Sequence, residues 1–265
     1  MLINKNTAIS TSSILLVPYK ASHVPTYHEW MKDEQIQAET ASEPLTLEEE
    51  YAMQRSWRTD ADKLTFIACL PLPSSSSSSL PRTLTPGAFD SPTHIIGDVN
   101  LFLTPSHSHS PSPSPSPSSS QSPSTHPLTG ELELMIATRT HRRKGHGRST
   151  ILAFLTYITT HLPSILSEYG KAQNPPIEEG KVELEGLRVK IGKENEKSLG
   201  LFRGLGFGSV GGGEEEPNYF GEVELWFRGD GEVVLGEEHM RKLREKFGVE
   251  GYEEIGYGVE DTRCT

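Results

Sequence analysis

Two segments rich in serine and proline limit how much of this 265-residue chain can fold. Residues 105–127 contain 11 Ser and 7 Pro, and residues 71–93 contain 7 Ser and 5 Pro. Because such segments bury too little apolar surface to offset the entropy of ordering, we expect both to be disordered. The remaining length predicts one globular domain over residues 1–227, interrupted by the two insertions and followed by an acidic extension over residues 228–265.

Composition and charge exclude several classes of protein. The longest apolar run, Ile151–Leu162, is interrupted by polar residues and falls short of the ~20 residues that cross a bilayer, so no membrane association is expected. Residues 1–10 are too polar for a secretion signal, and Cys69 and Cys264 are too few for a disulfide framework or a zinc site. These features predict a cytoplasmic or nuclear protein without a metal. The formal net charge of −11 argues against a nucleic-acid partner bound through its phosphates.

Apolar patterning predicts strands that alternate with helices, which is typical of a mixed α+β sheet flanked by helices. Thr46 and Glu49 have the spacing of a capping box, so a helix is expected to begin there. The expected strands are Ile14–Val17, Leu64–Leu70, Ile95–Thr104, Glu131–Thr138, Val182–Ile191 and, as the last one, Glu222–Phe227. The expected helices are Val24–Met31, Thr46–Trp57, a long helix from Ile151, Ser198–Leu205 and Glu238–Phe247.

A basic turn containing two glycines lies between the strand at 131–138 and the long helix. It reads Arg142-Arg143-Lys144-Gly145-His146-Gly147-Arg148. Glycines let backbone amides approach an anion, a helix start carries the positive end of the dipole, and the four cationic side chains supply counter-charge. The turn therefore predicts a phosphate cradle, although a solvated basic loop explains the same residues. It is not a P-loop, because the Gly-Lys-Ser/Thr signature is missing.

A second motif follows the strand at 182–191. It reads Asn195-x-x-Ser198-x-x-x-Phe202-x-x-x-Gly206-Phe207. Asn195 is a good N-terminal cap, and Gly206 is a good helix stop. By itself this motif predicts only a short capped helix with an apolar face.

Taken in order along the chain, the two motifs resemble those of the GNAT superfamily of acyl-CoA-dependent N-acetyltransferases. The resemblance extends from about Ile14 to Phe227 outside the insertions. Several further runs look like the N-acetyltransferase 9 family of eukaryotic GNAT proteins. They are Val17-Pro18-Tyr19, His23-Val24-Pro25, residues 27–32, 40–46, 50–54 and 97–103, and Lys190-Ile191-Gly192.

The resemblance implies a GNAT fold, acetyl-CoA as the acetyl donor and a protein or peptide amine as the acceptor. It also implies that the strand at 131–138 splays from the strand at 182–191, with the pantetheine arm of acetyl-CoA in the gap. The acceptor is then expected between residues 40–57 and the loop at 210–221. The residues implied to contact the donor are Ile136, Ala137, Arg142, Arg143, Lys144, Gly145, His146, Gly147, Arg148, Asn195, Ser198 and Phe202.

The resemblance places Glu131 where some members of the superfamily carry their catalytic Glu. Glu133 shares its face by strand alternation, so Glu131 is the first choice for the base and Glu133 the second. Both could equally be solvated strand carboxylates. Many GNAT enzymes have a Tyr at the position of Phe202 as the proton donor to the CoA thiolate, and Phe202 cannot donate a proton. Two hypotheses remain: an active N-acetyltransferase, or a weak or inactive scaffold that binds acyl-CoA or a protein partner.

Overall fold

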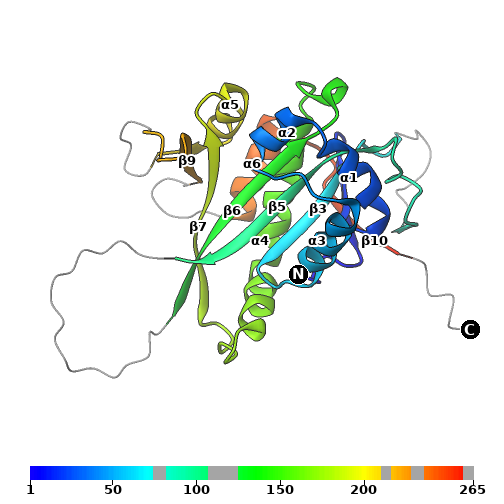
Figure 1. Ribbon diagram of the computed structural model, residues 1–265. Helices are drawn as coiled ribbons and strands as arrows, with labels where there is room; N and C mark the ends of the chain where they lie inside the picture. The colour runs from blue at the N-terminus through cyan, green and yellow to red at the C-terminus, as the bar shows by residue number, and fades with distance from the viewer. Residues whose placement is uncertain (74–81, 107–124, 210–215, 228–235, 259–265) are drawn as a thin grey trace, which may run out of the picture.

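The computed structural model of this protein describes residues 1–73, 82–106, 125–209, 216–227 and 236–258 (Figure 1). Within these residues one ten-stranded mixed sheet has the order β4-β10-β1-β2-β3-β5-β6-β7-β9-β8. The strands are β1 Thr7–Ser10, β2 Leu15–Pro18, β3 Lys63–Cys69, β4 Thr83–Leu84, β5 Ile95–Pro105, β6 His126–Ile136, β7 Val182–Gly192, β8 Phe207–Gly208, β9 Glu222–Phe227 and β10 Glu253–Tyr257. The helices are η1 Ala21–His23, α1 Val24–Trp30, α2 Glu34–Glu39, α3 Leu47–Thr59, η2 Arg139–His141, α4 His146–Ala172, α5 Glu196–Gly204 and α6 Glu237–Lys246.

Helices cover both faces of the sheet, with α1 and α3 on one face and α4 on the other (Figure 1). Strand alternation sorts the side chains between the two layers. Leu64 and Phe66 on β3 belong to the core under α4, whereas Ile67 belongs to the core under α1. Thr65 therefore faces the side of α1 and α3. The predicted capping box at the start of α3 is present, because Thr46 and Glu49 accept hydrogen bonds from each other's backbone amides.

The helix α4 is longer than the apolar run that predicted it. By length and composition alone, its 27 residues could cross a membrane, whereas the run Ile151–Leu162 is too short to do so. The ten residues 149–158 are all buried, and the helix packs against β5, β6 and β7. A helix that forms the centre of a core meets the same criterion of length and apolarity, and α4 occupies that place here.

The strands β6 and β7 separate part-way along their length. They pair in parallel from His126↔Val182 to Glu131↔Arg188, and both strands then continue without pairing to each other. On its other edge, β6 stays paired with β5 as far as Gly97↔Ile136. The splay expected from the sequence therefore begins directly after Glu131.

Part of the first insertion is folded, which corrects the expectation that residues 71–93 are disordered throughout. Thr83–Leu84 forms β4 and pairs in parallel with β10. Asp90 is buried, and its carboxylate accepts hydrogen bonds from the Tyr257 hydroxyl and the Gly87 amide, with the His23 ring at 2.8 Å. Residues 74–81 and 107–124, which include most of the serine-rich stretches, lie outside the described residues.

The segment beyond residue 227 contributes to the main sheet, so Glu222–Phe227 is not the last strand. The strand β10 pairs with β1 in antiparallel register, and α6 packs against α4. The expected helix at 238–247 is confirmed as α6. The expectation missed β10 because only Ile255 and Tyr257 in this strand are buried, which leaves a weak apolar pattern.

Candidate active site

The turn before α4 presents backbone amides in the way that an anion requires. Gly145 is the N-cap of α4 with φ of 90°, a left-handed conformation that glycine adopts without steric cost. No side chain among the described residues caps this end of the helix. The amides of His146 and Gly147 have no acceptor within the helix, because the first turn of any helix lacks one. This geometry fits the phosphates of an acyl-CoA.

The cationic side chains of the turn differ in how far they are already engaged. Arg143, Lys144 and Arg148 are exposed. Arg142 Nε donates to the Ile136 carbonyl at 2.7 Å, and its Nη1 lies 3.7 Å from Glu39. The Arg148 guanidinium lies 4.4 Å from the centre of the Phe247 ring. Arg143 and Lys144 are therefore the more accessible charges for a diphosphate.

His146 also connects the basic turn to another part of the fold. Its Nδ1 lies 3.2 Å from the Ser13 carbonyl in the turn between β1 and β2. The start of α4 is thus attached to the turn between β1 and β2.

Of the two backbone amides expected near the thioester, one is already hydrogen-bonded to the neighbouring strand. The Ala137 amide donates to the Ile96 carbonyl at 2.8 Å, so it cannot also polarise a bound carbonyl, and that expectation is corrected. Amides along a strand point alternately to its two edges. The Ile136 amide therefore points toward the gap between β6 and β7.

The second motif places Asn195 and Phe202 in structural roles. Asn195 caps α5, because its Oδ1 accepts the Ser198 amide at 3.2 Å. Phe202 is only 4% exposed and packs edge-on against Phe207, with ring centres 5.1 Å apart. Its side chain points into the core under α4, and the expected contact of Phe202 with the donor stays a prediction.

Glu131 is held by two cations at the last paired position of β6 and β7. Its Oε2 lies 3.0 Å from Arg188 Nη2 and 2.9 Å from Lys190 Nζ. Both cations lie on β7, so this carboxylate is engaged across the two strands. The structure therefore gives Glu131, the first choice from the sequence, an ion-pairing role.

Glu133 has the properties expected of a base. Its side chain is open to solvent, two residues beyond the last pair of β6 and β7. Surrounding protein atoms disfavour its charged form, and the nearby carboxylates of Asp98 and Glu131 add repulsion; together they raise its pKa to about 7. Lys190 acts in the opposite direction. Glu133, the second choice from the sequence, is thus the carboxylate able to gain and lose a proton near neutral pH.

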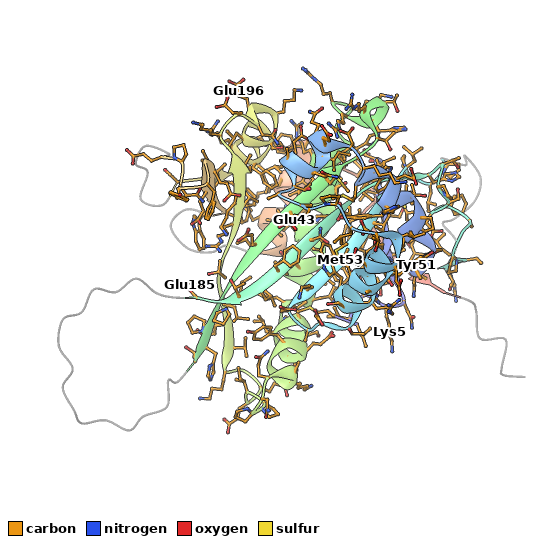
Figure 2. All side chains as sticks on the ribbon, viewed as in Figure 1. Lys5, Glu43, Tyr51, Met53, Glu185 and Glu196 are labelled. Carbon is orange, nitrogen blue, oxygen red and sulfur yellow. The ribbon has the colours of Figure 1, made fainter. Side chains whose placement is uncertain are left out.

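A buried polar layer next to Glu133 was missed by the sequence analysis. Asn100 lies opposite Glu133 on β5, and its Nδ2 donates to Asp98 at 2.9 Å. Burial raises the pKa of Asp98 to about 6, and the hydrogen bonds from Asn100 and Tyr27 oppose that rise. The alternation of Asp98 and Asn100 with Val99 and Leu101 is visible in the sequence, but polar residues at such spacing normally face solvent. Here the helices α1 and α3 cover them, and Tyr51 and Met53 of α3 pack on this face (Figure 2).

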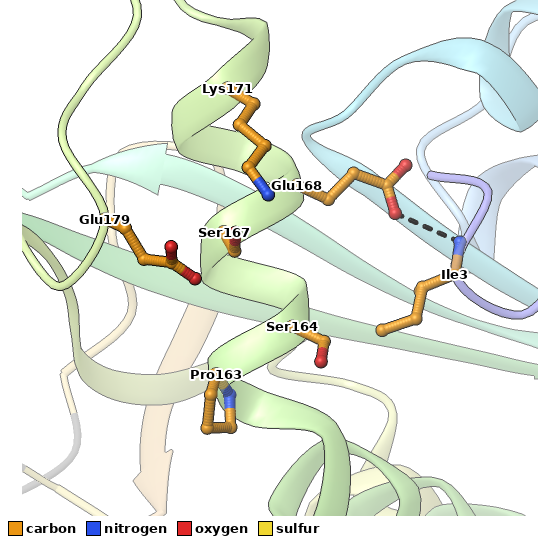
Figure 3. A pocket seen from close by; sticks show the side chains of 7 residues that line it. All are labelled: Ile3, Pro163, Ser164, Ser167, Glu168, Lys171 and Glu179. Atoms are coloured by element: carbon orange, nitrogen blue, oxygen red, sulfur yellow. Dashed lines mark hydrogen bonds between the residues drawn. The ribbon is translucent and has the colours of Figure 1, made fainter.

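A hollow of about 510 Å³ lies elsewhere, along the C-terminal half of α4 (Figure 3). Its Glu168 carboxylate accepts the amides of Leu2 and Ile3, and Lys171 and Glu179 line it. None of the predicted site residues lines this hollow. Among the described residues, no group of three or more His, Cys, Asp or Glu side chains could hold a metal ion.

The sequence of this chain matches a known protein family. Residues 13–208 match the acetyltransferase (GNAT) domain family. The chain belongs to the GNAT acetyltransferases. The GNAT resemblance of its two motifs is thereby confirmed, and the activity is N-acetyl transfer.

Curated relatives place this GNAT protein in the N-acetyltransferase 9 family. It is 40% identical over 231 residues to the N-acetyltransferase 9-like protein of Schizosaccharomyces pombe, covering 85% of this chain and 97% of the relative. It is 40% identical over 252 residues to human alpha/beta-tubulin-N-acetyltransferase 9, covering 94% of each chain. Among solved structures, a Vibrio cholerae spermidine N-acetyltransferase in complex with CoA and spermine is 17% identical, covers 81% of this chain and 94% of its own, and has a TM-score of 0.48.

Proposed function

We propose that this GNAT protein transfers the acetyl group of acetyl-CoA to an amine of a protein acceptor, with Glu133 as the base. The observation that carries this proposal is the solvent-open Glu133 with a pKa of about 7 at the splay of β6 and β7. A base works best when its pKa is close to the working pH, because it must both accept and release the proton.

The residues near the splay fit the donor. Acetyl-CoA supplies an activated thioester carbonyl. The amides of His146 and Gly147, with the exposed Arg143 and Lys144, form the site for its phosphates. The Ile136 amide points toward the gap and can donate to the thioester oxygen as negative charge develops there.

Glu133 removes a proton from the acceptor's ammonium group, and the neutral nitrogen then attacks the thioester carbonyl directly. Because Glu133 is open to solvent, it can release that proton after each turnover. A thiol has a pKa of about 8.5, so CoA leaves as a thiolate near neutral pH without an obligatory proton donor. The missing Tyr at position 202 is therefore compatible with activity.

The names of the relatives point to tubulin as the acceptor, because the human and Drosophila proteins are both called alpha/beta-tubulin-N-acetyltransferase 9. The pKa of Glu133 favours an α-amine over a lysine. Proton transfer from an α-ammonium of pKa ~8 to a carboxylate of pKa about 7 costs ~1.4 kcal/mol, whereas transfer from a lysine of pKa ~10.4 costs ~4.6 kcal/mol.

The test is acetyl transfer with purified tubulin and two matched peptides, one with a free α-amine and no lysine, the other N-terminally blocked with one lysine. Release of CoA thiol reports turnover, and mass spectrometry locates the acetyl group. We expect transfer to tubulin and to the free α-amine. Binding of acetyl-CoA without release of CoA in the presence of any acceptor would favour the inactive scaffold.

A further inference from the structure

Three polar residues form a row across adjacent strands on the face under α1 and α3. Thr65 on β3 lies opposite Asn100 on β5, and Asn100 lies opposite Glu133 on β6. Side chains directly opposite on antiparallel strands have Cβ atoms about 4.5–5.5 Å apart. The row therefore brings a hydroxyl, an amide and the base together.

Two oxygen atoms in this row are buried without a hydrogen-bond partner. They are Thr65 Oγ1 and Asn100 Oδ1, in residues that are 2% and 3% exposed. Folded proteins rarely leave buried polar atoms unpaired, because burial removes their water without a replacement. Two such atoms in one row with the base indicate a group that the protein binds during its function.

The direction of the Asn100 amide is set by its neighbour. Asp98 Oδ2 accepts from Asn100 Nδ2 at 2.9 Å and from the Tyr27 hydroxyl at 3.4 Å. An ionised carboxylate only accepts hydrogen bonds, so Asn100 must turn its NH₂ toward Asp98. Its Oδ1 is left as an acceptor, which suits a ligand that carries N–H donors.

The charge around the row favours a cation. Glu50 of α3 is 1% exposed and its Oε2 is also without a partner. Glu50, Asp98 and Glu133 all lie near enough to Tyr27 to raise the pKa of its hydroxyl. On β7 the cations Arg188 and Lys190 pair with Glu131, and His28 Nδ1 lies 4.0 Å from Glu50. Acidic groups thus predominate around the row, which attracts positive charge.

We propose that Thr65 and Asn100 form, with Glu133, the binding site for the ammonium group of the acceptor, an inference that rests on the proposed function. One N–H proton passes to the Glu133 carboxylate. The remaining N–H groups are held by Asn100 Oδ1 and Thr65 Oγ1, and the nitrogen lone pair is left free to attack. The ligand class is a primary ammonium, R–NH₃⁺.

The variant Thr65→Val tests this site, because it removes the hydroxyl while keeping the shape of the side chain. The KM for the acceptor should rise roughly tenfold, the order expected for one lost hydrogen bond to a charged group. The acetyl-CoA dissociation constant should stay unchanged, and the melting temperature should stay equal or rise, because the lost hydroxyl has no partner in the fold. Thr65→Ser should restore the KM.

The matched control is Thr150→Val. The Thr150 hydroxyl is also buried without a partner, but it lies on α4, behind the opposite face of the sheet. This variant should keep the KM of the parent protein for the acceptor. Its melting temperature should also stay equal or rise. A KM that is unchanged in Thr65→Val, or raised equally in both variants, would overturn the inference.

A direct titration separates the inference from the proposed function. Ethylammonium, added to the full chain, should produce saturable shifts in the backbone amide NMR signals of residues 65 and 100, and ethanol should not. The shifts should be lost or weakened in Thr65→Val. If the chain acetylates tubulin but ethylammonium causes no shift, the inference is wrong and the function stands. If no acceptor is acetylated, the proposed function fails while this titration still decides the site.

Discussion

Asn100 and Glu133 lie directly opposite each other on β5 and β6, yet Asn100 is buried while Glu133 is open to solvent. The boundary between a covered polar layer and solvent thus passes between two neighbouring side chains. On the covered side, Asp98 adds a second carboxylate that repels the charge of Glu133. On the open side, β6 has already separated from β7. A base at this boundary can exchange protons with solvent, and the charge of the buried layer still raises its pKa.

The role of Asp98 predicts a shift in the pH dependence of catalysis. In the parent protein, kcat/KM should rise with pH through about 7 as Glu133 loses its proton. Asp98→Asn removes a charge that raises the pKa of Glu133, so the rise should move to lower pH. Asp62→Asn, at an exposed carboxylate, should leave the midpoint unchanged. A pH-rate profile of all three proteins makes the comparison, and coincident midpoints would contradict it.

The same substitution predicts a gain in stability that depends on pH. Burial raises the pKa of Asp98 from 3.8 to about 6, so its favourable contribution is present below 3.8 and lost as the pH rises through 6. Asp98→Asn should therefore raise the free energy of unfolding above pH 6, by up to about 3 kcal/mol, and lose this advantage near pH 4. Urea denaturation at pH 4 and pH 8 measures the difference. An equal effect at both pH values would show that the Asp98 charge is not the cause.

The phosphate cradle predicts the effect of a charge at Gly147. A Cβ there would contact Leu134 at 3.3 Å, so the position is closely packed against β6. Gly147→Glu places a carboxylate at the start of α4, where it repels phosphates, and acetyl-CoA affinity should fall at least tenfold by calorimetry. Gly204→Glu, at an exposed site on α5 with open space around it, is the control and should bind normally. Normal binding by Gly147→Glu would place the donor site elsewhere.

The capping box of α3 predicts a modest loss of stability in Thr46→Ala. The Thr46 hydroxyl accepts the Glu49 amide, and an N-cap of this kind contributes about 1 kcal/mol. Thr59→Ala, at the other end of the same helix, removes a hydroxyl that bonds only within the helix and should cost less. Thermal denaturation of the two variants should therefore differ, and a larger loss in Thr59→Ala would contradict the assignment.

The folded part of the first insertion predicts a contribution from Tyr257. Its hydroxyl donates to the buried Asp90 carboxylate, which joins residues 82–93 to β10. Tyr257→Phe removes a hydrogen bond to a charged group and should lower the free energy of unfolding by about 1.5–3 kcal/mol. Tyr252→Phe, whose hydroxyl bonds to the exposed Glu254, should lose less. Equal losses in urea denaturation would mean that the Asp90 contact is not stabilising.

Local patterns in the sequence predicted the features that depend on neighbours along the chain. The Thr46 cap, the strands 95–104 and 182–191 and the Gly145 turn all follow from short spacings, and the structure contains each of them. The strand β10 and the folded residues 82–93 depend instead on distant partners. Their sequences are too polar for any local pattern to reveal them.

The sequence could not distinguish the two candidate bases for a similar reason. Glu131 and Glu133 are equivalent by alternation, and only the positions of Arg188 and Lys190 on β7 distinguish them. Likewise, the sequence gives no sign that α1 and α3 cover Asp98 and Asn100. For Phe202, the resemblance supplied a position in the motif, whereas packing against Phe207 decides where the ring lies.

The most direct test compares Glu133→Gln with Glu131→Gln in the acetylation of tubulin across pH 6 to 9. Removal of a general base typically lowers the rate by about 10²–10⁴-fold. We predict a loss in this range for Glu133→Gln, together with loss of the inflection near pH 7, and less than a tenfold loss for Glu131→Gln. Acetyl-CoA affinity should be unchanged in both. A Glu133→Gln protein with nearly full activity, or a greater loss in Glu131→Gln, would contradict the assignment of Glu133 as the base.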